Sequence, residues 1–376
     1  MNSRERAVAA LSHKEPDRVP VDLAATTVTS IARPAYASLR LHLGMEPDPD
    51  PLIANRQMGI VYPRSDLLEH YEIDFRPVNM KSPWGFKVAE MPDDSFYDEF
   101  GIRWKRAGNY YDIVEFPLAG CTTNDLLTAT WPDPADPGRA HGLREDVKAL
   151  YLNTDTCIVA GIMCGGPFEQ ACCLRGFQDF CLDLHLDARF AEALLDRITD
   201  TDLALWDIYL DAVGEFAQVV CQGDDVGMQT GLFISPAMWR RLIKPRLRRI
   251  FDFVHSRTDA RIFLHTCGSV YDIIGDLIEI GVDILNPVQR SAARMDIQVL
   301  KREFGNDICF WGGGVDVQQF LPFASRQEIE TDIKRTVDIM APGGGFVFAA
   351  CHNIQADVTP DRIDAVYSAA LRRRVP

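Results

Sequence analysis

Two side chains that bind soft metal ions stand two positions apart in the second half of the chain. His265 and Cys267 follow the apolar run 261–264. Because side chains alternate in an extended chain, both should face the same side where this strand ends. Cys351 also follows an apolar run and has His352 beside it. Histidine and cysteine are typical zinc ligands, and three of them leave one position for a substrate oxygen or thiolate. The spacing therefore predicts a zinc site at His265, Cys267 and Cys351.

A second interpretation of these cysteines stays open. The chain has ten cysteines, and a buried reduced cysteine is often only a small apolar filler. Metal binding by His265 and Cys267 alone would be a weak prediction. The distant Cys351 is what raises it to an even choice between the two interpretations.

Polar side chains after other apolar runs are candidates for binding the substrate. Asp224 and Asp225 can orient a substrate or a pterin ring through charge-assisted hydrogen bonds, and we assign them to catalysis. An aspartate that only forms a turn is an equally good explanation. Gly312 and Gly313 follow a later run, where backbone N–H groups of barrel enzymes often bind a phosphate or carboxylate.

Three amides complete the candidate set. Gln222, Gln229 and Asn286 are assigned to cofactor binding because each stands at or shortly after the end of an expected strand. The amide groups of Gln222 and Gln229, like that of Gln289, could instead simply satisfy backbone groups.

The elements that must position these residues are eight buried runs that alternate with helices. The runs centre near residues 19, 76, 160, 219, 263, 284, 309 and 348, and the expected helices include 168–184, 188–213, 236–256 and 270–280. Eight such units predict an α/β fold, a (β/α)8 TIM barrel with N-terminal helices, whose active site lies at the carboxyl ends of its strands. The polar residues expected to meet there are Asp22, Glu169, Gln222, Asp224, Asp225, His265, Cys267, Asn286, Gln289, Asp316, Cys351 and His352.

One segment departs from this pattern. Residues 84–117 consist of short alternating runs rich in aromatic side chains, typical of antiparallel hairpins. We expect residues 1–376 to form a single barrel domain with an insert at about 82–118. The insert is either a simple cover or a lid over the substrate.

Composition narrows the class of partner. Lys and Arg number 39 against 54 Asp and Glu, so the net charge is −15. Binding to nucleic acid needs a basic surface that displaces counterions, and this chain should have no nucleic-acid partner. The cysteines lack regular spacing, and no apolar stretch suits a signal peptide or a membrane span. These features indicate a cytoplasmic protein in a reducing compartment, with no membrane partner.

Several phrases spread over nearly the whole chain resemble the uroporphyrinogen decarboxylase superfamily, and more closely its corrinoid-linked methyltransferase branch. The phrases are RER…HKEPDRVP (4–20), GDDVGMQ (223–229), HTCGSV (265–270), GVDILNP (281–287), WGG (311–313) and PGGG…HNIQ (342–355).

The resemblance implies a reaction and its cofactors. Zinc methyltransferases of this superfamily hold zinc with a His-x-Cys pair and a distant cysteine, which His265, Cys267 and Cys351 match. They move a methyl group between a small molecule and the cobalt of a corrinoid (cobalamin) protein. The small molecule would be a methoxylated aromatic or other O- or N-methyl compound, a thiol, or tetrahydrofolate. Some relatives add a carboxylate ligand after the next strand, where this chain has Asn286 and Gln289.

The same resemblance leaves two other functions open. His352 matches a histidine near the last strand of the decarboxylases, so it is a catalytic candidate for a metal-free decarboxylase. However, residues 24–30, AATTVTS, replace the arginine-containing phrase that grips the decarboxylase substrate. A non-catalytic barrel that only docks a corrinoid protein is the third hypothesis. The run 183–185 lacks the glycine of a cobalt-ligating loop, so the corrinoid should be carried by a separate protein; a homodimer is compatible with all three hypotheses.

Overall fold

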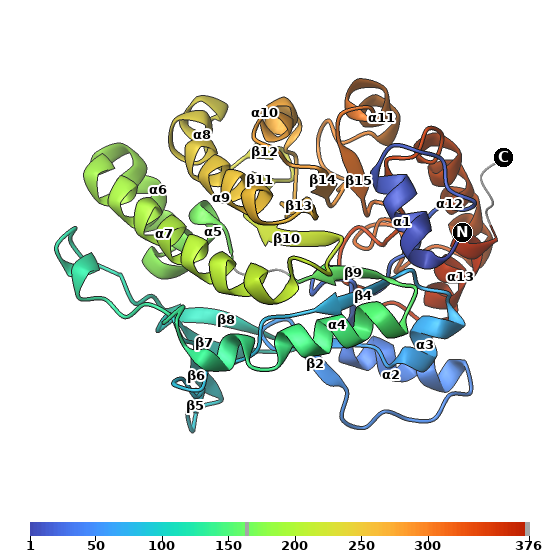
Figure 1. The fold of residues 1–376 in the computed structure, drawn as a ribbon, viewed down its shortest axis with the longest axis horizontal. Helices are drawn as coiled ribbons and strands as arrows, with labels where there is room; N and C mark the ends of the chain where they lie inside the picture. Colours follow the sequence, from blue (N-terminus) through green and yellow to red (C-terminus); the bar gives the residue numbers. More distant parts are fainter. Residues whose placement is uncertain (162–164, 373–376) are drawn as a thin grey trace.

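A computed structural model describes residues 1–161 and 165–372. Its centre is a curled parallel sheet of seven strands in the order β16-β15-β14-β13-β10-β9-β4, with helices packed around it (Figure 1). The strands are β4 (Phe75–Val78), β9 (Cys157–Ala160), β10 (Val219–Gly223), β13 (Arg261–His265), β14 (Ile284–Asn286), β15 (Cys309–Trp311) and β16 (Phe346–Val347). Seven of the eight predicted runs are therefore strands, and the α/β barrel is confirmed. Residues 162–164, at the end of the run around residue 160, lie outside the described part.

The eighth run, residues 18–23, closes the barrel without forming a regular strand. Val21 makes a single parallel bridge to Phe348. The amide of Asp22 donates to the Phe348 carbonyl at 2.8 Å, and the amide of Asp74 donates to the Val21 carbonyl at 3.0 Å. The predicted full strand is wrong because Pro20 has no N–H to continue the ladder. The segment nevertheless lies between β16 and the start of β4.

Alternate residues of the seven strands fill the barrel interior, as the two-residue period of a strand requires. These inward side chains form one buried cluster with Ala7 and Leu11 of α1 (Ser3–Leu11), a helix that contacts β9 and β16. The strand members are Phe75, Cys157, Val159, Val219, Cys221, Phe263, Ile284, Cys309, Trp311 and Val347, and Ala349 joins them two residues beyond β16. Three of the cysteines are thus the small apolar fillers considered above.

The barrel helices largely follow the predicted order. Helix α7 (Ala188–Val213) has the predicted bounds. The other uninterrupted helices are α2 (Arg33–His42), α3 (Ser65–His70), α4 (Leu143–Asn153), α11 (Ile297–Phe304), α12 (Arg326–Met340) and α13 (Pro360–Leu371). Short helical turns occur at η1 (Asp125–Leu127) and η2 (Pro137–Ala140).

Three predicted helices are interrupted. The helix expected at 168–184 is α5 (Pro167–Arg175) and α6 (Phe177–Leu186), because Gly176 takes a φ of 94° that breaks the helix. The helix expected at 236–256 is α8 (Pro236–Leu242) and α9 (Lys244–Arg257), because Pro245 cannot donate to a preceding turn. The helix expected at 270–280 begins as the turn η3 (Tyr271–Ile273) before α10 (Ile274–Glu279).

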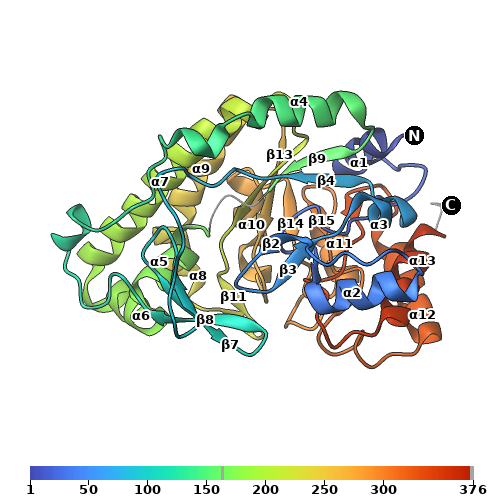
Figure 2. The same cartoon turned by 90° about the horizontal axis from the view of Figure 1, so that it is seen from below.

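The aromatic-rich segment forms a separate sheet that projects beside the barrel, away from α10 and α11 (Figures 1 and 2). Its antiparallel strands are β5 (Ala89–Glu90), β6 (Ser95–Tyr97), β7 (Arg103–Ala107) and β8 (Tyr110–Glu115). The predicted antiparallel insert is therefore outside the barrel wall. Two further small sheets were not predicted, and they consist of β1 (Ile31–Ala32), β2 (Leu52–Asn55) and β3 (Ile60–Tyr62), and of β11 (Gly227–Met228) with β12 (Gly231–Leu232).

A buried ion network holds the N-terminal segment against the start of β4. Asp74 is fully buried and accepts hydrogen bonds from Arg6 at 2.7 Å and from Arg18 at 2.7 and 3.1 Å. It also accepts the amide of Val21 at 2.8 Å. The N-terminal phrase that carries part of the family resemblance therefore has a structural role here, at the end of the barrel opposite the carboxyl ends of the strands.

Two negative observations apply to the described residues. Within 1–161 and 165–372, no helix is both long enough and apolar enough to cross a membrane. The nine cysteines in this part of the chain are all free thiols.

Candidate active site

The two residues of the His-x-Cys pair lie where the sequence placed them, at the carboxyl end of β13. The Nε2 atom of His265 is 3.4 Å from the Sγ atom of Cys267. The ring of His352 packs edge-on against that of His265, with 5.5 Å between ring centroids. Each of the three residues offers one ligand atom, and these atoms all lie within 4.8 Å of one another. Among the described residues, this is the group of side chains whose spacing could hold a metal ion. Such a set of two imidazoles and a thiol suits zinc.

Asn286, at the end of β14, fixes the His265 ring. Its Nδ2 donates to the Trp311 carbonyl at 2.9 Å, so its Oδ1 faces Nδ1 of His265 at 2.6 Å. An amide oxygen can only accept, and Nδ1 must therefore carry the proton. The lone pair of His265 is left on Nε2, directed toward Cys267. This second contact is the arrangement that usually orients a histidine ligand.

Asp225 organises the other member of the pair. Its Oδ1 accepts the backbone N–H of Cys267 at 2.7 Å and lies 3.8 Å from Nε2 of His265. Burial, followed by the negative charges of Asp225, Cys351 and Glu169, raises the pKa of the Cys267 thiol well above its usual range. Without a cation nearby this thiol is protonated at neutral pH, so a bound metal ion would have to displace its proton.

His352 is held in its neutral form. Burial, and then repulsion from His265, lowers the pKa of His352 to about 4. A neutral imidazole has a free lone pair, which both metal coordination and proton acceptance require. The structure therefore brings His352 into the same group as the His-x-Cys pair.

Cys351 lies beside this group but faces elsewhere. Its Sγ is 3.6 Å from the carbonyl oxygen of Val288, in the loop after β14, and the residue is buried. Burial, and then the charge of Asp316, raises the pKa of Cys351 to about 12.

A group of carboxyls borders the site. Asp224 is 1% exposed, and its Oδ1 accepts the N–H groups of Phe168 and Glu169 at 3.0 and 2.8 Å, at the start of α5. Glu169 in turn accepts the N–H of Asp225 at 3.2 Å. Burial and the neighbouring Asp225 raise the pKa of Glu169 to about 7, and burial also raises the pKa of Asp224 well above its usual range. Glu169 can therefore hold or release a proton near neutral pH.

The candidate glutamines mainly join loops or support the core. Gln289 accepts the N–H of Gly268 at 2.7 Å and donates to Gln229 at 2.9 Å, which ties the loops after β13 and β14 together. Gln222 is buried and accepts the indole N–H of Trp206 at 3.0 Å. These contacts fit the alternative in which amides satisfy neighbouring groups.

Gly312 and Gly313 let the loop after β15 approach that after β14. Their φ angles are 88° and 73°, a region that favours glycine. A Cβ atom on Gly313 would stand 2.6 Å from the Val288 carbonyl oxygen, and one on Gly312 would stand 3.1 Å from Nδ2 of Asn286. Close packing therefore explains both glycines without a bound anion.

Asp22 and Asp316 also have local partners. Asp22 accepts the indole N–H of Trp311 at 2.8 Å and the N–H of Ala25 at 2.7 Å. Asp316 accepts three backbone N–H groups from the turn 318–320. Two of the polar residues expected at the carboxyl ends of the strands, Asp22 and Asp316, therefore stabilise neighbouring parts of the chain.

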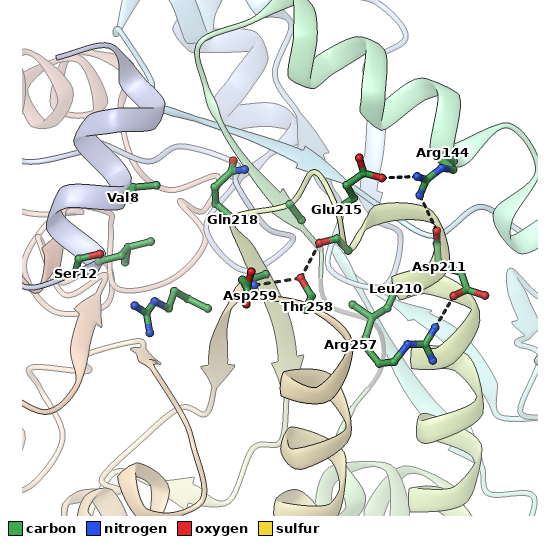
Figure 3. A pocket seen from close by; sticks show the side chains of 15 residues that line it. Val8, Ser12, Arg144, Leu210, Asp211, Glu215, Gln218, Arg257, Thr258 and Asp259 are labelled. Atoms are coloured by element: carbon green, nitrogen blue, oxygen red, sulfur yellow. Dashed lines mark hydrogen bonds and ion pairs between the residues drawn. The ribbon is translucent and has the colours of Figure 1, made fainter.

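A pocket of about 720 Å³ lies at the opposite end of the barrel (Figure 3). It is lined by Gln218 and Arg261, at the amino ends of β10 and β13. Four of the charged groups that line it form two ion pairs, Arg144 with Glu215 and Arg257 with Asp211, both drawn in Figure 3. Barrel enzymes carry their chemistry at the carboxyl ends of the strands, so this pocket is not the candidate site.

A second pocket, of about 520 Å³, lies where the insert meets the chain after His352. Its lining includes Met58, Arg106, Tyr110 and Gln355. The hydroxyl of Tyr110 hydrogen-bonds to Oε1 of Gln355 at 2.6 Å, which joins the β7–β8 hairpin to the loop three residues beyond His352. The insert is therefore attached to the chain segment that carries part of the site.

The sequence did not reveal how neighbouring residues position His265 and Cys267. Asn286 was considered for cofactor binding, whereas its contacts position His265. The strand register carries the signal, because His265 pairs directly with Asn286 across β13 and β14. Two expected strands whose polar ends align in this way predict neighbouring side chains on the same face.

Comparison with known proteins gives one family and two kinds of relative. The family model for uroporphyrinogen decarboxylase (URO-D) matches residues 119–372. Uroporphyrinogen decarboxylases from Citrifermentans bemidjiense and a Geobacter species are 24% and 23% identical over 209 residues. Those alignments cover 53% of this chain and 55% of each relative, so the chain spans about half the length of the curated relatives it matches.

A solved structure resembles the whole chain. It is a methyltransferase from Methanosarcina mazei, with a TM-score of 0.65 and 19% identity, and the match covers 99% of both chains. At this identity the likeness establishes the fold. The family match includes every residue of the candidate site from Glu169 to His352.

Proposed function

Because the chain belongs to the uroporphyrinogen decarboxylase family, we propose that its barrel serves as a methyltransferase of the corrinoid-linked branch. The methyl group would move between a small molecule and the cobalt of a separate corrinoid protein. The observation that carries the proposal is the grouping of His265, Cys267 and His352 within 4.8 Å at the carboxyl ends of the strands.

The donor set supports zinc as the metal. His265 presents the lone pair of Nε2, because Asn286 binds the other nitrogen, and the Cys267 sulfur is 3.4 Å from that atom. The third ligand would come from the Cys351–His352 pair, of which the sequence pattern favours Cys351. When bound, zinc would polarise an oxygen or sulfur of the small molecule as its methyl group leaves or arrives.

The surrounding residues would position the pair and handle protons. Asp225 holds the Cys267 backbone in place, and Glu169 holds Asp225. With a pKa of about 7, Glu169 could give a proton to a departing alkoxide or take one from an arriving thiol. The loops around the site would be supported by Gln222, Gln229, Asn286, Gly312 and Gly313. Tetrahydrofolate would be one of the small molecules that the site binds.

We further propose that the insert is a lid. The contact between Tyr110 and Gln355 would close the chain over the pocket of about 520 Å³ that both residues line. Opening this contact would admit the small molecule or the corrinoid.

A metal-free decarboxylase is the second candidate, favoured by the names of the two bacterial relatives and by His352. Its substrate carries many carboxylates, which require cationic side chains. Residues 24–30, where the sequence comparison placed the substrate-gripping arginines, contain no charged side chain and are largely buried. This region favours the methyltransferase.

The direct test mixes the purified protein with cob(I)alamin, or with a corrinoid protein, and a panel of methoxylated aromatics, other O- and N-methyl compounds, methylated thiols and methyltetrahydrofolate. Transfer to cobalt changes the corrinoid absorption spectrum. Uroporphyrinogen decarboxylation is measured in parallel. Cys267→Ala should abolish methyl transfer, whereas Arg144→Ala, at the opposite end of the barrel, should leave it intact.

The proposal fails if no methyl donor or acceptor reacts with any corrinoid. It also fails if uroporphyrinogen is decarboxylated and Cys267→Ala retains that activity. Metal analysis of protein purified without chelator should find zinc in the wild type and little in Cys267→Ala.

A further inference from the structure

The chain turns sharply at the end of the last barrel strand, and this turn decides which of two adjacent side chains faces the His-x-Cys pair. Ala350 makes a parallel bridge to Val315, and the N–H of Cys351 donates to the Val315 carbonyl at 3.0 Å. This contact fixes the backbone at Cys351. The Cys351 thiol then meets the Val288 carbonyl at 3.6 Å, whereas the next side chain, His352, packs against His265.

We propose that His352, rather than Cys351, is the third protein ligand of the metal. The ion would then be held by two imidazole nitrogens and one thiolate, a departure from the cysteine-rich pattern that the sequence suggests. The inference rests on the proposed function, because it assumes that the His265 and Cys267 pair binds a metal.

The first support is distance. The ligand atoms of His265, Cys267 and His352 already lie within 4.8 Å of one another. Zinc–nitrogen and zinc–sulfur bonds of about 2.0–2.3 Å place ligand atoms of a tetrahedral site roughly 3.3–3.8 Å apart. His265 and Cys267, at 3.4 Å, already meet that spacing. His352 would need only a small shift to complete the set.

The second support is the environment of Cys351. Its thiol is buried and lies 3.6 Å from the Val288 carbonyl oxygen. To bind the ion it would have to leave the Val288 carbonyl. Cys309 shows the same structural use of cysteine, since its buried thiol contacts the Leu11 carbonyl oxygen at 3.4 Å.

The ligand set bears on the class of substrate. Each thiolate cancels one positive charge of the ion, so a site with one thiolate is one unit more positive than a site with two. A more positive ion polarises neutral oxygen ligands more strongly, and it activates a bound thiol as a nucleophile less well. The inferred set therefore favours an ether or alcohol methyl donor over a thiol acceptor.

The test counts sulfur ligands without reference to activity. X-ray absorption of the zinc-loaded wild type measures the sulfur and nitrogen neighbours directly, and it requires no variant. We expect one sulfur and two histidine nitrogens. In the cobalt(II)-substituted protein, the sulfur-to-cobalt charge-transfer band should have the intensity of a single thiolate and should vanish in Cys267→Ser.

Two neighbouring variants provide the matched comparison. Cys351→Ser should retain one metal per chain and an unchanged charge-transfer band. His352→Gln should lower zinc affinity by more than the roughly 10- to 100-fold typical of an outer contact. Circular dichroism checks that both remain folded.

Two sulfur neighbours in the wild type, or a Cys351→Ser protein with half the charge-transfer intensity, would overturn the inference and leave the proposed methyltransferase intact. Failure of the wild type to bind zinc or cobalt(II) at all would overturn the inference as well, and it would separately remove the metal from the proposed function. Loss of metal from both variants would show a four-residue site and would also contradict the three-ligand set.

Discussion

Replacing Asn286 with alanine should separate the support of the metal site from the stability of the barrel. The Asn286 side chain is 1% exposed and links two buried groups, Nδ1 of His265 and the carbonyl of Trp311. The substitution leaves both without a partner. Each unsatisfied buried group costs about 1–3 kcal/mol, so the free energy of unfolding should fall by about 2–6 kcal/mol.

The effect on zinc should be distinct. Loss of the outer contact of a histidine ligand typically weakens metal binding roughly 10- to 100-fold. Chelator competition measures this affinity, and urea denaturation of the metal-free protein measures stability. Asn286→Asp keeps an acceptor for His265 but places an oxygen opposite the Trp311 carbonyl. That variant should lose stability while its zinc affinity stays at or above that of the wild type.

Gln218 provides the matched control at the other end of the barrel. Its amide accepts the N–H of Ile158 at 2.9 Å and donates to the Phe216 carbonyl at 2.7 Å. Gln218→Ala should therefore lower stability and leave zinc affinity unchanged. If Asn286→Ala behaved in the same way, the reasoning that Asn286 orients His265 would be refuted.

Four further outcomes follow from the structure. Asp74→Ala should lower the free energy of unfolding by about 3–5 kcal/mol in urea denaturation, because it removes the fully buried carboxylate that Arg6 and Arg18 share and leaves Arg6 paired with Asp17 only; a loss below about 1 kcal/mol would contradict this. Gly313→Ala should cost about 2–4 kcal/mol, against about 1 kcal/mol for Gly343→Ala, because both have positive φ but only Gly313 has a carbonyl within 2.6 Å of the added Cβ; equal melting temperatures would count against it. Arg6 holds the pKa of the Asp17 carboxyl below its usual range, so the contribution of this ion pair to stability is present above about pH 4 and is lost as the pH falls further. The free energy of unfolding of Asp17→Asn should therefore depend less on pH in acid than that of the wild type. Tyr110→Phe removes the contact with Gln355 and should speed proteolysis within the insert without changing global stability by more than about 1 kcal/mol; an unchanged cleavage rate would argue against a lid that opens there.

The barrel could be predicted from the sequence because each interior strand is a short apolar run with a fixed place between helices. The interruptions were harder. At Gly176 the apolar pattern continues across the break, and only the backbone shows that the residue has φ of 94°. The sheet of β1, β2 and β3 escaped prediction because strands of two to four residues have too few positions to display alternation.

The site was predictable in its ligand types but less so in its contacts. His265 and Cys267 share a side of the chain by simple alternation, which the sequence reveals. Whether Cys351 or His352 faces them depends on the turn fixed by Val315, a contact 36 residues away in the chain that the local sequence does not indicate. The role of Asn286 likewise arises from pairing between strands.

The closure of the barrel by Val21 also constrains how the protein is made. The partner of Val21 is Phe348, so the N-terminal segment cannot take its final place until almost the whole chain has been synthesised. At about 5–20 residues per second, that wait lasts roughly 15–65 seconds. During it, the open edges of β4 and of each newly finished strand are unpaired and prone to associate with other chains. A circular permutant that begins near β4 and joins the native ends before residue 18 would place these partners close in sequence, and it should refold faster with less aggregation.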